Sequence, residues 1–337
     1  MVTAAVPWAW HGAAHTRFFD DQVAWLAAAC SKTTITALMR ISWRTVGVII
    51  ARVSADRLAQ ADPLAGLTRI GIDEISYKRG HKYLTVVVDH DTGRLVWAAP
   101  GRDRRTLAGF FDALGDRATA LTHVSADGAD WIAAEVRSRA PQAVLCADPF
   151  HVVSWATGAL DEVRREAWRQ ARTAGETKPA RHGSRVITTP AGAARDLKGA
   201  RYALWKNPEN LTGKQAVKLA WIGKTSPYLY RAYLLKEGLR LAFQLGGEEG
   251  RRAISRWLSW AARSRIPEFV SLGRKIRAHL PTICATLDHG LSNGLIESVN
   301  TKIRVITRMA FGFHNPTALI GLAMLALGGL RPDIPGR

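Results

Sequence analysis

Three carboxylates stand where acidic side chains can hold a metal ion that acts on phosphate. Asp73 ends the apolar run "RIGID", and Asp127 ends a second run, "LTHVSAD". Both runs predict strands, so both acids are expected at the carboxyl ends of strands, where α/β sheets place their ligand sites. Two neighbouring carboxylates repel each other unless a cation lies between them, and Mg²⁺ prefers carboxylate oxygens. The alternative for each acid alone is a strand-end turn.

A third acid, Glu297, lies in "HGLSNGLIESVNTKIRVITR", which has the periodicity of an amphipathic helix with Ser292 or Asn293 as its cap. The apolar stripe consists of Leu295, Val299, Ile303 and Ile306, and the other face carries Glu297, Asn300 or Thr301, Arg304 and Arg308. One acid and two arginines on one face suit a site that binds metal and phosphate together. Alone, Glu297 is better explained as an acid that complements the helix dipole; its combination with Asp73 and Asp127 favours the functional interpretation.

The segments around Asp73 and Asp127 predict an α/β fold in the order β-β-β-α-β-α-β-α. Strands are expected at 69–76, 83–89, 94–99, 121–127 and 143–148, and "HDTGR" supplies the turn between the second and third. A hairpin followed by right-handed βαβ units gives a mixed sheet with flanking helices. In that sheet the first strand can pair in parallel with the fourth, which would bring Asp73 beside Asp127.

The first sixty residues predict helices, and two of them fit a helix-turn-helix over about 31–53. The break falls near Ile41–Ser42, and Ser42 is a suitable cap for the second helix. In that helix Val46, Ile49, Ile50 and Val53 recur at helical spacing, while Arg44, Thr45 and Arg52 remain to face outward. The second helix would be the one that enters a DNA major groove. The alternative is an ordinary helical hairpin packed on the core.

The charge of the chain predicts a polyanionic partner. Its 337 residues include 47 Lys and Arg against 28 Asp and Glu, a net charge of +19. Nucleic acid is the first candidate; a membrane surface is disfavoured because the basic residues are spread over several segments. Three isolated cysteines indicate neither a disulfide framework nor a zinc ribbon, and fit a reducing cytoplasm. The most apolar stretch, Ala318–Leu330, is too short to span a bilayer.

Strand signals fade from about Trp155 to Asp288, where helical, basic and tryptophan-rich segments follow one another. This is either a second helical domain or a large insertion. We therefore expect four regions: an N-terminal helical region at 1–64, the first part of an α/β core at 65–156, a helical segment at 157–287, and closing core helices at 288–337.

Five blocks in order resemble the ISL3 family of bacterial insertion-sequence transposases. They are "IGIDE…KRGHKYLTVVVD…TGR", "VSADGADW", "APQAVLCADPFHVV", "LKGARYALWKNPENLT" and "SNGLIESVNTKIRVITRMAFGFHN". The resemblance extends over roughly residues 8–330 and places the chain among the DDE transposases, whose core is RNase H-like. It implies that Asp73, Asp127 and Glu297 are the catalytic triad, and that the helical segment is an insertion within the catalytic domain.

The expected activity is metal-dependent hydrolysis of a phosphodiester at the element's ends, followed by attack of the freed 3′-OH on target DNA. Two Mg²⁺ ions, with Mn²⁺ as a substitute, would be held by the triad. The expected partners are terminal inverted repeats and target DNA, bound by a homo-oligomer at the bacterial nucleoid. The expected DNA contacts are Arg44, Thr45, Arg52, Lys78, Arg79, Lys82, Asn300, Lys302, Arg304 and Arg308.

The motif "DPFH" is a second candidate constellation. Asp148 ends the fifth strand and His151 follows three residues later, resembling an acid-x-x-His motif of several transposase families. A metal-ligand role is one interpretation; a structural role at the strand–helix turn, or a DNA contact, is favoured over it. Asp148 is also the main rival of Asp127 as second catalytic acid. Asp127 is preferred because its strand should neighbour the first.

Many relatives begin with a cysteine-rich zinc-binding segment, whereas no cysteine precedes Cys30 here. We therefore expect weakened end recognition or a shortened chain. A shortened or inactive transposase that acts only by binding DNA is the alternative function. A DNA-binding regulator would not need the three acids, and a nuclease on the same fold would cleave without strand transfer.

Overall fold

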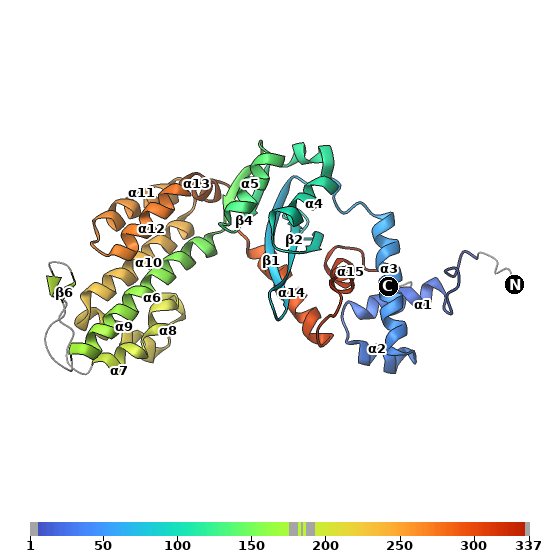
Figure 1. Cartoon of the computed structure of the whole chain (residues 1–337), viewed down its shortest axis with the longest axis horizontal. Helices are drawn as coiled ribbons and strands as arrows, with labels where there is room; N and C mark the ends of the chain where they lie inside the picture. Colours follow the sequence, from blue (N-terminus) through green and yellow to red (C-terminus); the bar gives the residue numbers. More distant parts are fainter. Residues whose placement is uncertain (1–5, 175–180, 183–184, 187–192, 334–337) are drawn as a thin grey trace. The chain divides into compact units, whose positions relative to one another are not determined.

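The computed structural model describes residues 6–174, 181–182, 185–186 and 193–333 (Figure 1). The chain forms two compact units, one made of Met1–Leu145 with Asn293–Arg337 and the other of Cys146–Ser292. The first unit is therefore discontinuous in sequence. Each unit has its own hydrophobic core, and the two are described separately.

A five-stranded mixed sheet organises the first unit. Its strands are β1 (Arg69–Lys78), β2 (Lys82–Asp89), β3 (Leu95–Pro100), β4 (His123–Ala126) and β5 (Val144–Ala147). Their order is β3-β2-β1-β4-β5. β2 pairs antiparallel with both β1 and β3, while β4 pairs parallel with β1. The predicted hairpin and the predicted parallel pairing of the first and fourth strands are both confirmed.

Alternation along β1 sends its side chains to two different cores. Ile70 and Ile72 lie in a cluster with α4 (Arg104–Leu114), the 3-10 helix η1 (Gly115–Ala120) and α5 (Asp130–Arg139). Ile75 lies in the cluster on the other face, with α14 (Gly294–Met309) and α15 (Pro316–Leu327). Successive strand residues point to opposite faces. Asp73 therefore faces the same side as Ile75, towards α14, and Glu74 faces the side of Ile72.

The N-terminal helices are α1 (Arg17–Ala27), α2 (Lys32–Met39) and α3 (Trp43–Gln60). Ser31 and Ser42 each accept a hydrogen bond from a backbone N–H three residues later, so both helices begin where serine can cap them. Arg40 adopts a left-handed conformation between α2 and α3, and their axes differ by 103°. A short turn with this angle is the helix-turn-helix geometry. The predicted apolar face of the second helix, Val46 to Val53, is buried as expected.

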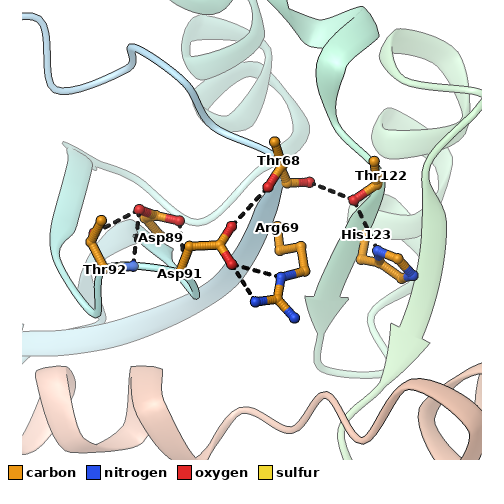
Figure 2. A network of polar contacts seen from close by, with 7 residues as sticks. All are labelled: Thr68, Arg69, Asp89, Asp91, Thr92, Thr122 and His123. Atoms are coloured by element: carbon orange, nitrogen blue, oxygen red, sulfur yellow. Dashed lines mark hydrogen bonds and ion pairs between the residues drawn. The ribbon is translucent and has the colours of Figure 1, made fainter.

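The amino-terminal end of β1 is fixed by a polar network (Figure 2). The Asp91 carboxylate, in the β2–β3 turn, accepts hydrogen bonds from Thr68 Oγ1 at 2.7 Å and Arg69 Nε at 2.8 Å. Thr122, just before β4, donates to the Thr68 carbonyl at 3.1 Å. The start of β1 is thereby tied to both of its neighbours.

The second unit is helical around one large core. Its helices are α6 (Pro149–Ala174), α7 (Ala193–Lys198), α8 (Arg201–Trp205), η2 (Pro208–Asn210), α9 (Gly213–Thr225), α10 (Pro227–Leu245), α11 (Gly247–Arg263), α12 (Pro267–Ala278) and α13 (Leu280–His289), with a short strand pair β6 (Arg181–His182) and β7 (Arg185–Val186). α6 continues across the expected boundary between 156 and 157. Within the described ranges no single helix is long and apolar enough to cross a membrane, although α2 and α3 together meet that criterion by length and composition.

Candidate active site

The parallel register brings Asp73 and Asp127 to the same edge of the sheet. β1 and β4 are paired from Arg69 with His123 to Ile72 with Ala126. Asp73 is the next residue of β1 and Asp127 the first residue after β4, so both acids directly follow the last paired position. Asp73 Oδ1 accepts from the Glu74 backbone N–H at 2.8 Å, and Asp127 Oδ1 from that of Ala129 at 3.0 Å.

Helix α14 is tied to the sheet at two asparagines that flank Glu297. Asn300 Nδ2 donates to Asp73 Oδ2 at 2.8 Å, which joins the helix to β1. Ser125 of β4 donates to Asn293 Oδ1 at 2.7 Å, which joins the helix start to the strand that carries Asp127. Glu297 lies between them, one turn before Asn300. The three acids predicted from the sequence therefore lie on or next to β1, β4 and α14, which these hydrogen bonds join.

The Ser125–Asn293 bond belongs to a buried relay that also includes His90. The hydroxyl of Ser125 lies 2.8 Å from His90 Nε2, at the end of β2. Asn293 occupies the N-cap position of α14, but its side chain makes no cap hydrogen bond. Its Oδ1 instead accepts the hydrogen bond from Ser125 of β4. Burial lowers the pKa of His90, with Arg69 adding to the effect. A neutral imidazole is therefore favoured in the relay.

Negative charge accumulates at this end of β1. Glu74 is almost fully buried and pairs with Arg102, whose Nε lies 3.3 Å from Glu74 Oε1. Burial raises the pKa of Glu74 to about 7, and repulsion from Asp127 and Asp73 adds to the rise against the opposing effect of Arg102. Three carboxylates thus share one region and one nearby ion-paired cation. Such an arrangement favours binding of an added cation.

The donor chemistry of Asp73, Asp127 and Glu297 fits a hard divalent cation, because carboxylate oxygens are its preferred ligands. Within the described part of the chain, no three His, Cys, Asp or Glu side chains are grouped closely enough to hold a metal ion. The Asp73 carboxylate is instead engaged by Asn300. Ion binding would therefore require these side chains to draw together.

Some of the residues expected to contact DNA are exposed, and others bond to residues of the protein itself. Side chains that are exposed as expected are those of Arg44, Lys78, Arg79, Lys82, Lys302, Arg304 and Arg308. The basic loop forms the tip of the β1–β2 hairpin, with Gly80 and His81 both at positive φ. Beside it lies a cavity of about 540 Å³ lined by Lys82 and Arg102.

Three expected DNA contacts have partners within the protein. Asn300 is buried and donates to Asp73, so the expectation that it faces DNA is wrong. Arg52 was expected to face outward, but its Nη1 lies 2.7 Å from the buried Asp20 carboxylate of α1, because a buried acid requires a partner. Thr45 is half-buried, and its hydroxyl lies 2.8 Å from that of Ser42.

The Asp148–His151 pair organises the start of α6. Asp148 is buried, and its Oδ2 accepts from the backbone N–H of His151 at 3.2 Å and lies 2.7 Å from His151 Nδ1. These are the bonds of a helix cap that the histidine ring reinforces. The geometry agrees with the favoured structural interpretation of the motif.

Comparison with known proteins identifies the family. The DDE model of the ISL3 family, described as "Transposase", matches residues 70–322, and a model described as "Helix-turn-helix domain of transposase family ISL3" matches residues 4–54. The chain belongs to the ISL3 family of transposases. It is an insertion-sequence transposase with a helix-turn-helix domain, and DNA is its partner.

Curated relatives of this ISL3 transposase include the transposases for insertion sequence element IS1557 of two Mycobacterium tuberculosis strains, each 64% identical over 99% of this chain and 76% of the relative. The transposase for IS1001 of Bordetella parapertussis is 30% identical over 86% of this chain and 70% of the relative. A solved Drosophila P element transposase strand transfer complex covers 96% of this chain and 81% of its own, at 13% identity and a TM-score of 0.28, which is too low to support an argument.

Proposed function

We propose that this ISL3 transposase cuts and joins DNA with Asp73, Asp127 and Glu297 as its catalytic carboxylates. The observation that carries the proposal is the register of β1 and β4, which aligns Asp73 with Asp127 beside a helix held to both strands. Phosphodiester hydrolysis at the element's ends would free a 3′-OH, which would then attack target DNA.

The proposed fold of the catalytic core is RNase H-like. The strand order β3-β2-β1-β4-β5, with β2 antiparallel and β4 parallel to β1, and helices on both faces support this assignment. We assign residues 1–64 to the helix-turn-helix region, 65–156 and 288–337 to the core, and 157–287 to a helical insertion. The alternation of β1 supports keeping Glu74 outside the triad.

The proposed cofactor is Mg²⁺, two ions per site, with Mn²⁺ as a substitute. The carboxylates of Asp73, Asp127 and Glu297 would hold it, and when bound it would stabilise charge on the attacking and leaving oxygens. Asn300 would orient the Asp73 carboxylate through its amide N–H. Asn293 and Ser125 would hold the start of α14, and with it Glu297, against the strand that leads to Asp127.

The proposed DNA surfaces lie on exposed cations of two regions. Arg44, at the start of α3, would contact the terminal inverted repeats, as the second helix of a helix-turn-helix does. Lys78, Arg79 and Lys82 of the hairpin tip would contact the backbone near the cleaved bond. Lys302, Arg304 and Arg308 of α14 would do the same. Pairing two DNA ends would require a homo-oligomer, assembled on DNA at the nucleoid.

The test is cleavage of a supercoiled plasmid that carries both ends of the element, with and without Mg²⁺ or Mn²⁺. Asp73→Asn, Asp127→Asn and Glu297→Gln should each lower cleavage by more than the roughly 10–100-fold typical of residues that merely support metal ligands. Retained binding of the terminal repeats would show that each variant is folded. Full cleavage by all three variants would contradict the assignment.

Asp148→Asn, tested in the same assay, decides between Asp127 and Asp148. If Asp148→Asn abolished cleavage and Asp127→Asn did not, Asp148 would be the second catalytic acid in place of Asp127. A wild type that binds the terminal repeats and never cuts them would support a DNA-binding relic instead.

A further inference from the structure

The helical unit contains a pocket whose lining has the chemistry of a nucleobase site. Its volume is about 570 Å³, within the range of ligand-binding sites in proteins. It is formed by the start of α6, the end of α8, the segment before η2, and the end of α10. Every lining residue belongs to the same compact unit.

Aromatic rings and amide groups line this pocket together. Phe150, Trp205 and Phe243 contribute ring surface, while Asn207 and Gln244 contribute side-chain amides and Ser154 a hydroxyl. Flat rings bind a base by stacking, and amides and hydroxyls pair with the polar edge of a base. The indole N–H of Trp205 is buried and has no acceptor among the described residues, so this ring offers the pocket its flat surface and not its polar edge.

The exposure of Phe150 also indicates a ligand. This phenylalanine follows Pro149 in the first turn of α6, and 64% of its surface is exposed. Its neighbours Asp148 and His151 fix the helix start through the cap bonds at 3.2 and 2.7 Å. The cap therefore holds Phe150 at the rim of the pocket, and offers one function for the "DPFH" motif.

The charges around the pocket favour a polyanionic ligand. The Arg201 guanidinium stacks on the Trp205 ring at 3.8 Å and is exposed. Neither Arg201 nor Lys206 has a carboxylate partner in the ion pairs of the described residues. The nearby acids Glu209 and Glu237 both pair with Arg240, at 2.9 and 2.8 Å, and Glu237 pairs with Lys236 as well. An acidic ligand would therefore meet free cations and paired carboxylates.

We propose that this pocket binds one unstacked base of single-stranded DNA. Bases inside a duplex are stacked and paired, so only a base that has left the stack can enter a pocket lined by rings. Two of the sequence blocks that mark the family, "APQAVLCADPFHVV" and "LKGARYALWKNPENLT", meet here and are not used by the three catalytic acids. The proposal rests on DNA as partner and is independent of the proposed catalytic carboxylates.

The first experiment compares the full-length protein and its variants by fluorescence anisotropy with a labelled single strand and with the same strand in a duplex. Phe150→Ala and Trp205→Ala should each weaken single-strand binding by about 5- to 150-fold, the usual effect of losing one base–aromatic stack. Duplex binding should stay unchanged. Trp205→Phe, which keeps a ring, should retain most of the affinity.

The matched control is Tyr202→Ala, which removes an exposed ring from α8 that does not line the pocket. An equal loss with Tyr202→Ala, or no loss with Phe150→Ala and Trp205→Ala, would overturn the inference. A wild type that binds no DNA at all would instead contradict DNA as partner, so the two failures are distinguishable.

A second experiment needs no variant. Wild-type protein is irradiated with a single strand that contains 5-iodouracil, and the crosslinked peptides are identified by mass spectrometry. Adducts on the peptides that contain Phe150, Trp205 or Phe243 support the pocket. Adducts confined to α3 or to the β1–β2 hairpin overturn it.

Discussion

The two ends of strand β1 treat their carboxylates in opposite ways. At the amino-terminal end, Asp91 is exposed by about a third and is matched by Arg69 and Thr68 (Figure 2). At the carboxyl-terminal end, the side chain of Glu74 is 5% exposed, pairs with Arg102, and feels the charges of Asp73 and Asp127. A hydrogen bond from Arg69 lowers the pKa of Asp91, whereas burial raises that of Glu74 to about 7.

This contrast distinguishes Asp91, whose charge is balanced within the protein, from the acids around Glu74, whose negative charge is only partly balanced. An acid that is paired with a cation can stabilise the fold, and it does not require a further cation. Acids that outnumber their cations cost stability in the free protein, and that cost is recovered when a cation binds. The imbalance lies at the carboxyl end of the strand, where ligand sites of α/β sheets are found.

The largest expected difference between the two ends is in catalysis. Asp73→Asn should reduce plasmid cleavage by more than about 100-fold, because it removes a proposed metal ligand. Asp91→Asn should leave the cleavage rate per folded molecule unchanged. Single-turnover cleavage, normalised to the folded fraction, makes the comparison. Equal losses for the two variants would mean that the charge imbalance does not mark the active site.

The next expected effect concerns the relay that positions α14. Ser125→Ala removes the hydroxyl that donates to Asn293, and the loss of this buried hydrogen bond should cost about 1–3 kcal/mol in the free energy of unfolding. It should also reduce cleavage roughly tenfold, as residues that orient metal ligands do. Binding of the terminal repeats should be unchanged.

Ser298→Ala is the matched control for this effect, because Ser298 is an exposed serine on the same helix. It should change neither cleavage nor stability, and Ser125→Thr should recover part of the lost cleavage. If Ser125→Ala lost stability but kept full cleavage per folded molecule, the relay would be structural only.

The two arginines provide a smaller test of the same contrast. Arg102→Ala removes the arginine that pairs with the buried Glu74 side chain. It should lower the free energy of unfolding by about 1–2 kcal/mol, discounted because Arg102 is half exposed. Arg69→Ala removes the partner of a much more exposed acid and should have a smaller effect. Urea titrations of both variants, without added metal, measure the difference. A larger loss of unfolding free energy for Arg69→Ala than for Arg102→Ala would contradict the view that the more buried pair contributes more to stability.

The smallest expected effect is the pH dependence of the Asp91 pair. Its folded pKa lies below the ordinary value of 3.8, so the pair contributes stability above that value and loses it as the pH falls through the lowered pKa. The melting temperature of wild type should therefore exceed that of Asp91→Asn slightly at neutral pH. The difference should vanish in acid. A difference that grew in acid would contradict this role.

Local pattern was sufficient to predict much of the fold, and it also supplied the three acids of the proposed site. The alternation around Asp73, the "HDTGR" turn and the Ser42 cap each depend on near neighbours in sequence, and the structure confirms the elements they predict. The parallel pairing of β1 with β4 followed from the preferred handedness of βαβ connections.

The misjudged residues all depend on contacts between distant segments. Asn300 was assigned to the outer face by helical spacing, but it bonds to Asp73 across 227 positions. Arg52 was assigned to the outward face by helical spacing within α3. Its partner Asp20 lies on α1, so the spacing within α3 gives no sign of the ion pair. Nothing local to Ser125 or Asn293 indicates their bond across 168 positions.

One local signal for the relay was present. Gly71 is a glycine within a strand, and a Cβ there would meet His90 Nε2 at 3.1 Å and Ser125 Oγ at 3.2 Å. A glycine in a strand interior often marks such a close approach. It indicates crowding at that point of the sheet, although it does not identify the groups that crowd it.

The discontinuity of the first unit has a consequence for biosynthesis. The ribosome must add residues 146–292 before α14 emerges, which takes roughly 7–30 seconds at ordinary rates of elongation. During that interval the helical unit has its own core around which to fold. The nascent sheet already carries Asp73 and Asp127 but lacks Glu297, so an interrupted translation product would be a transposase without its proposed third acid.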